Sequence, residues 1–176
     1  MIPNLISFFR IIYVFPICYF IFKNKFELAA ILFFFAGFSD FFDGYFARKL
    51  NQESKFGAML DPIADKVLIV TLIIILGIKG IIPIWFTSLI ILRDVLILLG
   101  GLYLLKFKGI NDMPPMMISK LNTMFVMFLI MDIFLGMLFD FDFFVRFKEN
   151  VIFLTSVTTM LSFIVYFKRF MELCKK

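Results

Sequence analysis

Histidine is absent from this chain of 176 residues, and cysteine occurs only twice, at Cys18 and Cys174. Neither cysteine has a partner at the spacing of a metal-binding or redox motif, so we expect no chemistry from them. We interpret Cys18 as a small apolar residue of a helix and Cys174 as a thiol in a basic tail. Zinc and copper sites rely mainly on imidazole and thiolate ligands. Both metals are therefore poor candidates for a site in this protein.

Charged residues are also scarce, at 18% of the chain, whereas 62% of the residues are hydrophobic and 28 are phenylalanine. A soluble domain carries about 25% charged residues and is about half apolar. The mean hydropathy of +1.02 and the long apolar runs indicate a membrane protein. The formal net charge is +5, but no basic face with interleaved aromatic residues is present, so we expect no nucleic-acid partner.

Six apolar segments approach the length of about 20 residues that a helix needs to cross a bilayer. We place them at residues 8–22, 27–49, 57–78, 82–106, 117–138 and 150–170. The first is short for a crossing, and no small-residue cleavage site follows it, so we expect it to remain as a membrane helix. The predicted fold is an all-α integral membrane protein of six transmembrane helices, with one domain over residues 1–176.

Lysine and arginine are distributed unevenly between the two ends of these segments. One side holds Arg10, Arg48, Lys49, Lys55, Lys66, Lys106, Lys108, Lys120, Lys168, Arg169, Lys175 and Lys176. The other side holds only Lys23, Lys25, Lys79, Arg146 and Lys148. Basic residues concentrate on the cytoplasmic side of membrane proteins. We therefore expect a multi-pass protein with both termini in the cytoplasm. Because polar signature residues begin at Asn4 and leave no room for a transit peptide, we expect it in the bacterial inner membrane.

Four aspartates interrupt the apolar pattern in two consecutive predicted helices. Asp40 and Asp43 are three residues apart, and Asp61 and Asp65 are four apart, so each pair shares a helix face. A short loop makes the two helices antiparallel neighbours, and their carboxylates can face each other. Four such carboxylates repel one another unless a cation lies among them. Oxygen ligands suit Mg²⁺ or Mn²⁺, and two ions would neutralise four aspartates.

The residues between the aspartates fit a phosphate-containing ligand. Gly44, Ala47 and Gly57 would let a bulky group approach the helix backbones, and the planar fork of Arg48 suits phosphate oxygens. Metal-bound carboxylates and phosphate oxygens together indicate metal-assisted phosphoryl transfer. The alternative is that the aspartates are interfacial charges that cap two helices, or that they form ion pairs with neighbouring basic residues.

Residues 40–65 follow the pattern D-x2-D-G-x2-A-R-x8-G-x3-D-x3-D without departure. This pattern resembles the signature of the CDP-alcohol phosphatidyltransferases, membrane enzymes that build phospholipids, and the six-segment layout extends the resemblance to the whole chain. The resemblance implies that Asp40, Asp43 and Asp61 are metal ligands. It implies that Asp65 lies in or next to this ligand set and acts as the general base. It further implies a CDP-linked lipid donor near the metals, loss of CMP, and a homodimer.

The N-terminal stretch IPNLISFFRI also resembles members of this family. We interpret Asn4 and Ser7 as contacts of the donor, together with Gly44, Ala47, Arg48 and Gly57. Arg10 is interpreted as a phosphate contact on the acceptor side. The alternative is a helix N-cap followed by an arginine that snorkels to the interface.

Two later stretches bear on the alcohol that accepts the phosphatidyl group. The run from Arg93 to Val95, and the run from Ser119 to Thr123, resemble the CMP-forming, mitochondrial-type cardiolipin synthases. Phosphatidylglycerophosphate synthases typically carry a second arginine where this chain has Gly101. They also tend to carry Gly-Lys-x-Lys-Thr where this chain has Ser-Lys-Leu-Asn-Thr. Two positive charges expected for glycerol phosphate are thus missing.

The charge of the acceptors favours the same choice. Glycerol phosphate carries a nearly dianionic monoester, whereas phosphatidylglycerol carries a diester with a single negative charge. We therefore predict transfer from CDP-diacylglycerol to phosphatidylglycerol, giving cardiolipin and CMP. The predicted acceptor residues are Arg10, Arg93, Lys120 and Asn122. Phosphatidylglycerophosphate synthase is the alternative, because Arg10 or Lys66 could supply the missing charge.

Arg93 has a structural alternative as well, a pair with Asp94 or Asp132. Adjacent residues on a helix do not face each other, so we expect Asp94 to be an awkward partner.

Two other classes of protein fit the sequence less well. A transporter would show internal repeats and helices broken near the midplane, and an arginine beside a cation pathway would be counterproductive. A catalytically inactive relative would have no use for four buried carboxylates.

Overall fold

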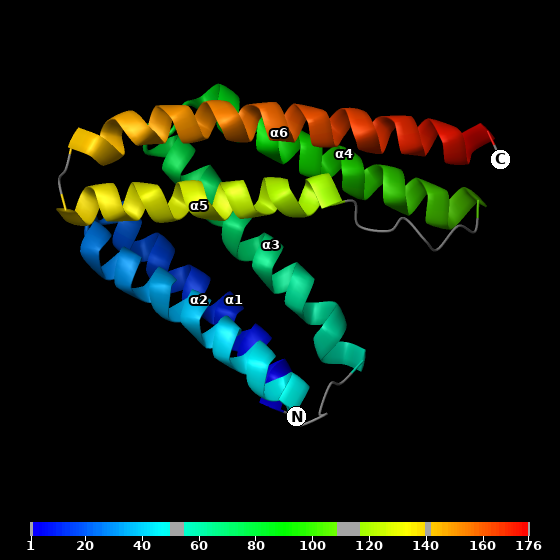
Figure 1. Ribbon diagram of the computed structural model, residues 1–176. Coiled ribbons are helices and arrows are strands. Elements are labelled where there is room, and N and C mark those ends of the chain that lie inside the picture. The colour runs from blue at the N-terminus through cyan, green and yellow to red at the C-terminus, as the bar shows by residue number, and fades with distance from the viewer. Residues whose placement is uncertain (1, 50–54, 109–116, 140–141, 176) are drawn as a thin grey trace. The chain divides into compact units, whose positions relative to one another are not determined.

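Six α-helices make up most of the chain that the structure, a computed structural model, describes (Figure 1). The described backbone covers residues 2–49, 55–108, 117–139 and 142–175, and the described side chains cover 12–37, 66–104, 106–107, 117–139 and 147–174. The helices are α1 (Ile2–Phe22), α2 (Phe26–Lys49), α3 (Lys55–Ile78), α4 (Ile84–Lys108), α5 (Met117–Phe139) and α6 (Asp142–Lys175). Over these ranges no strand occurs, and the all-α prediction is confirmed.

Each predicted segment corresponds to one of these helices. The largest differences are at α1, which begins six residues earlier than predicted, and at α6, which has 34 residues. The first helix is therefore 21 residues long and not short, since polar Asn4, Ser7 and Arg10 continue its turns. An interior Pro16 does not end it, as is common in membrane helices.

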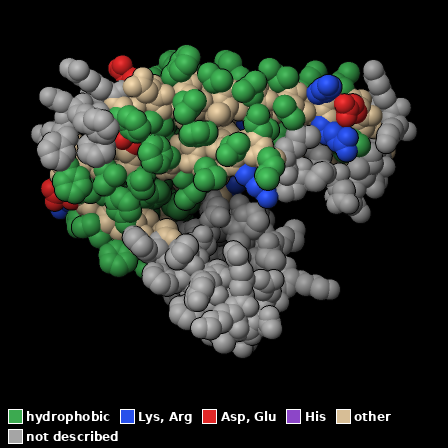
Figure 2. Space-filling view, viewed as in Figure 1, with side chains coloured by type: hydrophobic (Ala, Val, Ile, Leu, Met, Phe, Trp, Pro, Cys, Tyr) green, Lys and Arg blue, Asp and Glu red, His purple; other side chains and the backbone are tan. Residues whose placement is uncertain are grey.

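Three of the helices are long and apolar enough, within the described residues, to cross a membrane. These spans are Ile84–Leu104, Met117–Phe139 and Phe147–Cys174. Shorter apolar stretches lie at Ile12–Phe22, Phe26–Gly37 and Lys66–Ile78. The chain is thus a multi-pass membrane protein, and the number of six crossings stays a prediction. Figure 2 shows hydrophobic side chains over much of the described part of the face in view, as expected for a surface that meets lipid.

One compact unit consists of Met1–Lys79 with Phe134–Phe141. Within it, α1 packs against both α2 and α3. Ala29 and Ala30 of α2 are completely buried, and such small side chains allow neighbouring helices to pack closely. Lys79 Nζ donates hydrogen bonds to the backbone oxygen of Phe22, at 3.0 Å, and to Asn24 Oδ1, at 2.9 Å. The end of α3 is thereby fastened to the turn between α1 and α2.

The second compact unit consists of Gly80–Ile133 with Asp142–Lys176. Within it, α4 packs against α6, and Phe86, Leu104 and Leu129 are almost completely buried. Lys148 Nζ donates a hydrogen bond of 3.2 Å to the backbone oxygen of Ile81, which joins the start of α6 to the segment before α4. The prediction of one domain over residues 1–176 stays a prediction.

Candidate functional site

The signature residues lie on two consecutive helices, where the chain passes from α2 to α3. Asp40, Asp43, Gly44, Ala47 and Arg48 belong to the last turns of α2, and Gly57, Asp61 and Asp65 belong to the first turns of α3. Both segments are continuous α-helix, so the spacings of three and four residues place each aspartate pair on one helix face. The side chains of these residues lie outside the described part of the structure.

The donor set at these positions suits a hard divalent cation. Its four carboxylates offer only oxygen, which is the ligand type that Mg²⁺ and Mn²⁺ prefer. Asp40, Asp43, Asp61 and Asp65 are therefore the residues that would hold such ions. Among the described side chains there is no other group of three or more histidine, cysteine, aspartate or glutamate residues. The metal ligands stay a prediction.

The N-terminal residues of the predicted donor site also lie on a regular helix. Because α1 begins at Ile2, Asn4 and Ser7 are inside the helix and not at its N-cap position. The capping alternative therefore does not fit these two residues. Their side chains, and that of Arg10, lie outside the described part of the structure, so their predicted contacts stay predictions.

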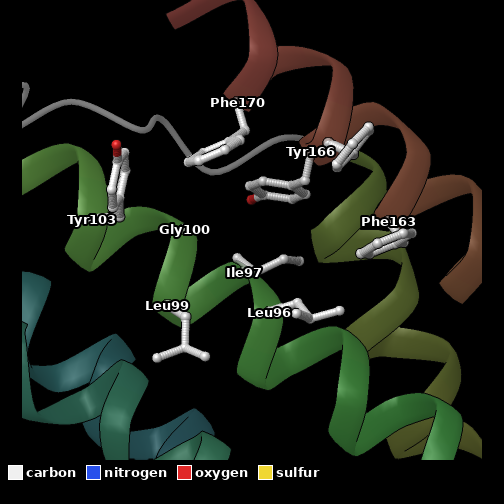
Figure 3. Close-up of a pocket in the computed structure, with 9 residues that line it drawn as sticks. Leu96, Ile97, Leu99, Gly100, Tyr103, Phe163, Tyr166 and Phe170 are labelled. Carbon is white, nitrogen blue, oxygen red and sulfur yellow. The ribbon is translucent and has the colours of Figure 1, made fainter. Parts of the chain in front are cut away.

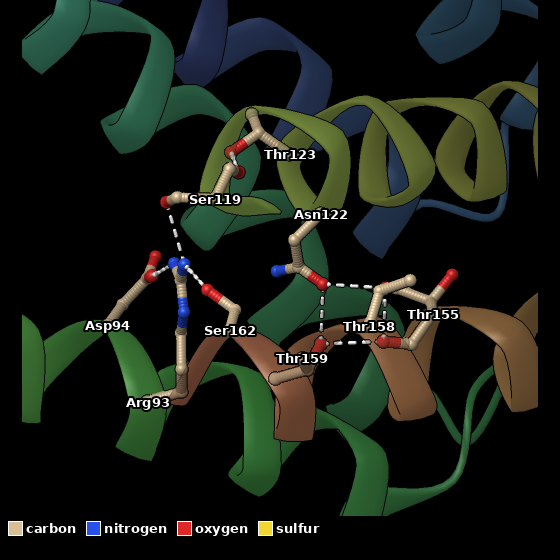
Figure 4. Close-up of polar contacts among 9 residues, drawn as sticks. All are labelled: Arg93, Asp94, Ser119, Asn122, Thr123, Thr155, Thr158, Thr159 and Ser162. Atoms are coloured by element: carbon tan, nitrogen blue, oxygen red, sulfur yellow. Dashed lines mark hydrogen bonds and ion pairs between the residues drawn. The ribbon is translucent and has the colours of Figure 1, made fainter. Parts of the chain in front are cut away.

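Arg93 on α4 forms the centre of a buried polar cluster in the second unit (Figure 4). Its side chain is only 4% exposed. Nη1 donates a hydrogen bond of 2.6 Å to Asp94 Oδ1, and Nη2 donates to the hydroxyl oxygens of Ser119, at 2.7 Å, and Ser162. The guanidinium also lies 5.8 Å from the ring centroid of Tyr166. One arginine thus connects α4 with both α5 and α6.

The expectation that Asp94 is an awkward partner for Arg93 is wrong. The Cβ atoms of adjacent helical residues diverge, but the arginine side chain is long enough for its guanidinium to reach the neighbouring carboxylate. Asp132 is not the partner, because it lies 13 residues beyond Ser119 on α5, about 20 Å along the helix axis. Asp132 is 3% exposed, and its Oδ2 has no hydrogen-bond partner.

This cluster limits what Arg93 can offer to a ligand. A guanidinium has five N–H donors, and three of them already point to protein oxygens. Its Nε is buried and has no hydrogen-bond partner. Binding of an acceptor phosphate by Arg93 would therefore use Nε or the remaining N–H of Nη1, or displace a serine hydroxyl. The role of Arg93 at the acceptor stays a prediction.

Asn122 lies in a second polar cluster of the same unit (Figure 4). It is 3% exposed, and its Oδ1 accepts hydrogen bonds from the hydroxyls of Thr158, at 3.0 Å, and Thr159, at 2.8 Å. Lys120, only two residues away, is exposed, because residues two apart lie on different sides of a helix. Of the predicted acceptor residues, Arg93 on α4 and Asn122 on α5 are thus buried, each in a polar cluster, whereas Lys120 is not part of either cluster.

The polar residues of α6 were not predicted from the sequence. Thr155, Thr158, Thr159 and Ser162 are spaced as i, i+3, i+4 and i+7, which puts them on one face of the helix. Both clusters use this face, since Ser162 contacts Arg93 and the two middle threonines contact Asn122. The signal that could have predicted this polar face is the repeat of hydroxyl residues at helical spacing within an apolar helix.

A family model of the CDP-alcohol phosphatidyltransferases matches residues 1–167 of the chain. The protein belongs to this family. A putative cardiolipin synthase of Mycobacterium tuberculosis is 37% identical over 125 residues, which is 69% of this chain and 58% of the relative. A cardiolipin synthase (CMP-forming) of Rattus norvegicus is 36% identical over 139 residues, which is 69% of this chain and 46% of the relative.

A relative with a different name matches over a greater length. The CDP-diacylglycerol–glycerol-3-phosphate 3-phosphatidyltransferase of Aquifex aeolicus is 33% identical over 165 residues, which is 91% of this chain and 89% of the relative. The matched part of the mycobacterial relative is only 58% of its length. The family match covers most of the chain, whereas relatives with two different names match it, so the acceptor alcohol is addressed as a proposal.

Proposed function

We propose that this protein transfers the phosphatidyl group of CDP-diacylglycerol to phosphatidylglycerol, giving cardiolipin and CMP. The observation that carries the proposal is the uninterrupted acidic signature, which lies on the adjoining ends of α2 and α3. The match to the family model and the relatives named as CMP-forming cardiolipin synthases support it.

In this proposal the carboxylates of Asp40, Asp43, Asp61 and Asp65 would hold two Mg²⁺ or Mn²⁺ ions. The ions would neutralise the negative charge of the donor diphosphate and of the departing CMP. Arg48 binds phosphate oxygens, and Gly44, Ala47 and Gly57 leave room for the cytidine. Asn4 and Ser7 complete the donor site from α1.

Asp65 accepts the proton of the acceptor hydroxyl in this mechanism. The resulting oxygen nucleophile attacks the phosphorus on the lipid side of the diphosphate, and the bond to CMP breaks. A carboxylate held close to the hydroxyl is suited to this role, since general bases contribute roughly 10²- to 10⁴-fold to a rate. Asp65 lies next to the start of the apolar run of α3, so lipid substrates in the bilayer can approach it.

The choice of phosphatidylglycerol as acceptor rests on the charge of the second unit. The predicted acceptor cations in this unit are Arg93 and Lys120, and three of the five N–H donors of Arg93 are engaged by protein oxygens. Position 122, where a phosphatidylglycerophosphate synthase tends to have lysine, is a buried asparagine that contacts two threonines. A site with so little free positive charge suits a singly charged diester better than a dianionic monoester.

Glycerol 3-phosphate is the second candidate acceptor. The long match to the Aquifex aeolicus relative favours it, because this match covers nearly the whole of both chains. Under either acceptor we propose a homodimer in a bacterial inner membrane with both termini in the cytoplasm. The bias of lysine and arginine between the ends of the helices supports this orientation.

An acceptor competition tests the proposal directly. Purified protein in mixed micelles would receive CDP-diacylglycerol, Mg²⁺ or Mn²⁺, and equal amounts of phosphatidylglycerol and glycerol 3-phosphate. We expect cardiolipin and CMP, with the activity lost on chelation of the metal and in Asp65→Asn but retained in Glu149→Gln, an exposed carboxylate. Phosphatidylglycerophosphate as the product would identify the second acceptor. No CMP release with either alcohol would overturn the enzymatic proposal.

A further inference from the structure

Serine hydroxyls engage both N–H groups of Nη2, one of the two terminal nitrogens of Arg93 (Figure 4). Ser119 on α5 accepts one of these hydrogen bonds, at 2.7 Å, and Ser162 on α6 accepts the other. One N–H of Nη1 donates to Asp94 Oδ1, at 2.6 Å. Of the five N–H groups of the guanidinium, these bonds leave over the N–H of Nε and the second N–H of Nη1.

Nη2 is the nitrogen that matters most for binding a phosphate. A guanidinium binds phosphate oxygens most tightly through two parallel N–H groups. Two of its edges offer such a pair, Nη1 with Nη2 and Nε with Nη2, and both of them include Nη2. A ligand that needs two parallel donors must therefore displace a serine hydroxyl. A ligand that needs a single donor can use Nε or Nη1.

The packing of the helices holds the two serines beside Arg93. Ser162 is completely buried and α4 packs against α6, so its hydroxyl can leave the arginine only if these helices separate. Ser119 is half-buried, and its backbone oxygen accepts a hydrogen bond of 3.1 Å from the hydroxyl of Thr123. Displacing either hydroxyl breaks a hydrogen bond to a charged group, and this cost weakens the binding of the ligand that causes it.

The groups described around the guanidinium include an aromatic ring and a carboxylate. The ring centroid of Tyr166 lies 5.8 Å from the guanidinium. Tyr166 is also one of four aromatic residues of α6 that line an apolar cavity of about 390 Å³ opposite Gly100 of α4 (Figure 3). None of the residues that line this cavity is charged, and the carboxylate of Asp94 offsets the charge of the arginine. The cluster therefore offers a ligand little net positive charge.

The two candidate acceptors would use Arg93 differently. The phosphate of glycerol 3-phosphate is terminal, with three free oxygens and nearly two negative charges, so it gains most from two parallel donors. The phosphate of phosphatidylglycerol lies between two ester groups, with two free oxygens and one charge. Because Arg93 is only 4% exposed, a phosphate that is flanked on both sides reaches one N–H more readily than two.

We propose that Ser119 and Ser162 are specificity-determining residues, which disfavour a phosphate monoester as acceptor by occupying Nη2 of Arg93. The inference rests on the proposed function, in which Arg93 contacts the acceptor phosphate. The serines leave single N–H donors for the phosphodiester of phosphatidylglycerol. Glycerol 3-phosphate has to displace a hydroxyl before two parallel donors can bind it. Neither serine has to touch the acceptor itself.

Acceptor kinetics of the purified full-length protein test this role. Ser119→Ala with Ser162→Ala frees both N–H groups of Nη2. The ratio of kcat/KM for glycerol 3-phosphate to that for phosphatidylglycerol should rise about tenfold, which is the contribution of about one added hydrogen bond to a charged group. The change should appear as a lower KM for glycerol 3-phosphate with kcat nearly unchanged, because the added bond is present in the ground state and the transition state alike.

Two matched variants separate specificity from a structural role. Ser119→Thr retains the hydroxyl and should retain the original ratio. Arg93→Lys, added to the double alanine variant, should remove the gain, because an ammonium group keeps the charge but lacks the planar fork. A gain that persists in this triple variant would overturn the proposal. An equal loss of kcat/KM for both acceptors in the double variant would also overturn it, since the serines would then only hold the helices together.

Binding of glycerol 3-phosphate alone gives a readout that requires no turnover. In isothermal titration the double variant should bind it about tenfold more tightly than the unchanged protein does, and equal affinities would overturn the proposal. Thermal unfolding in detergent shows whether the double variant is folded. If it is not, Ser119→Ala by itself frees one N–H and should give about a threefold effect in both measurements.

These outcomes keep the inference distinct from the proposed function. An unchanged ratio and an unchanged affinity, with CMP release intact, would reject the role of the serines alone. No CMP release with either acceptor in the unchanged protein would reject the proposed function, and the titration would still decide whether the serines limit the binding of a phosphate monoester.

Discussion

The acidic segment at the α2–α3 junction and the arginine cluster of the second unit both place charged groups in apolar helices, yet they differ in how their partners are distributed along the chain. The four aspartates fall within 26 residues, and their spacing within each helix is enough to group them on helix faces. Arg93 bonds to Ser119 and Ser162, which lie 26 and 69 residues away. A site built within neighbouring turns can be recognised in a sequence, whereas one built across three helices depends on how they pack.

The two regions should also respond differently to substitution, and the largest effect is expected in the acidic segment. Asp65→Asn should lower the rate of CMP release by about 10²- to 10⁴-fold, because the amide cannot take up the proton of the acceptor. Thermal unfolding of the variant should stay close to that of the unchanged protein. A helix-capping role would give the reverse result, with reduced stability and a nearly normal rate.

Removing Arg93 should instead damage stability. In Arg93→Met the partly buried Asp94 loses its ion pair with the arginine, and the hydroxyls of Ser119 and of the buried Ser162 lose this donor. Breaking a buried ion pair costs about 3–5 kcal/mol, so the unfolding transition in detergent should shift markedly downwards. If stability is unchanged and only KM for the acceptor rises, Arg93 is a ligand-binding residue and the cluster has little structural role.

Adding the positive charges that this chain lacks should change the acceptor preference. Gly101→Arg together with Asn122→Lys places cations where phosphatidylglycerophosphate synthases tend to have them. We expect the ratio of kcat/KM for glycerol 3-phosphate to that for phosphatidylglycerol to rise about tenfold, which corresponds to about 1.4 kcal/mol. Gly101→Gln with Asn122→Gln is the uncharged control. An unchanged ratio would show that the acceptor is selected elsewhere.

The smallest effect is expected from single hydroxyl groups of the second unit. Ser162→Ala removes one of the three hydrogen bonds of Arg93, and hydrogen bonds between membrane helices contribute about 0.6 kcal/mol on average. The loss should appear as a slight shift in thermal unfolding, with Ser88→Ala, an exposed serine of α4, as the control. A shift as large as that of Arg93→Met would mean that this serine alone holds the arginine in place.

The amino-acid sequence by itself determined the fold class, the approximate position of each helix and the family. Apolar runs interrupted by charges define membrane helices, since the bilayer sets their length, and the spacing of the signature residues identifies the family. The limits of α1 and α6 were less certain, because polar residues near the membrane surface continue a helix as readily as they end it.

The tertiary structure decided the partners of the buried polar groups. That Arg93 bonds to Asp94 and two serines, and that Asn122 faces threonines of α6, depends on which helix faces meet. The cavity beside Gly100 has the same origin, since the sequence shows a glycine and four aromatic residues but not that they lie opposite one another. Helix–helix contacts arise from packing between segments far apart in the chain, and in lipid no hydrophobic pattern marks them in advance.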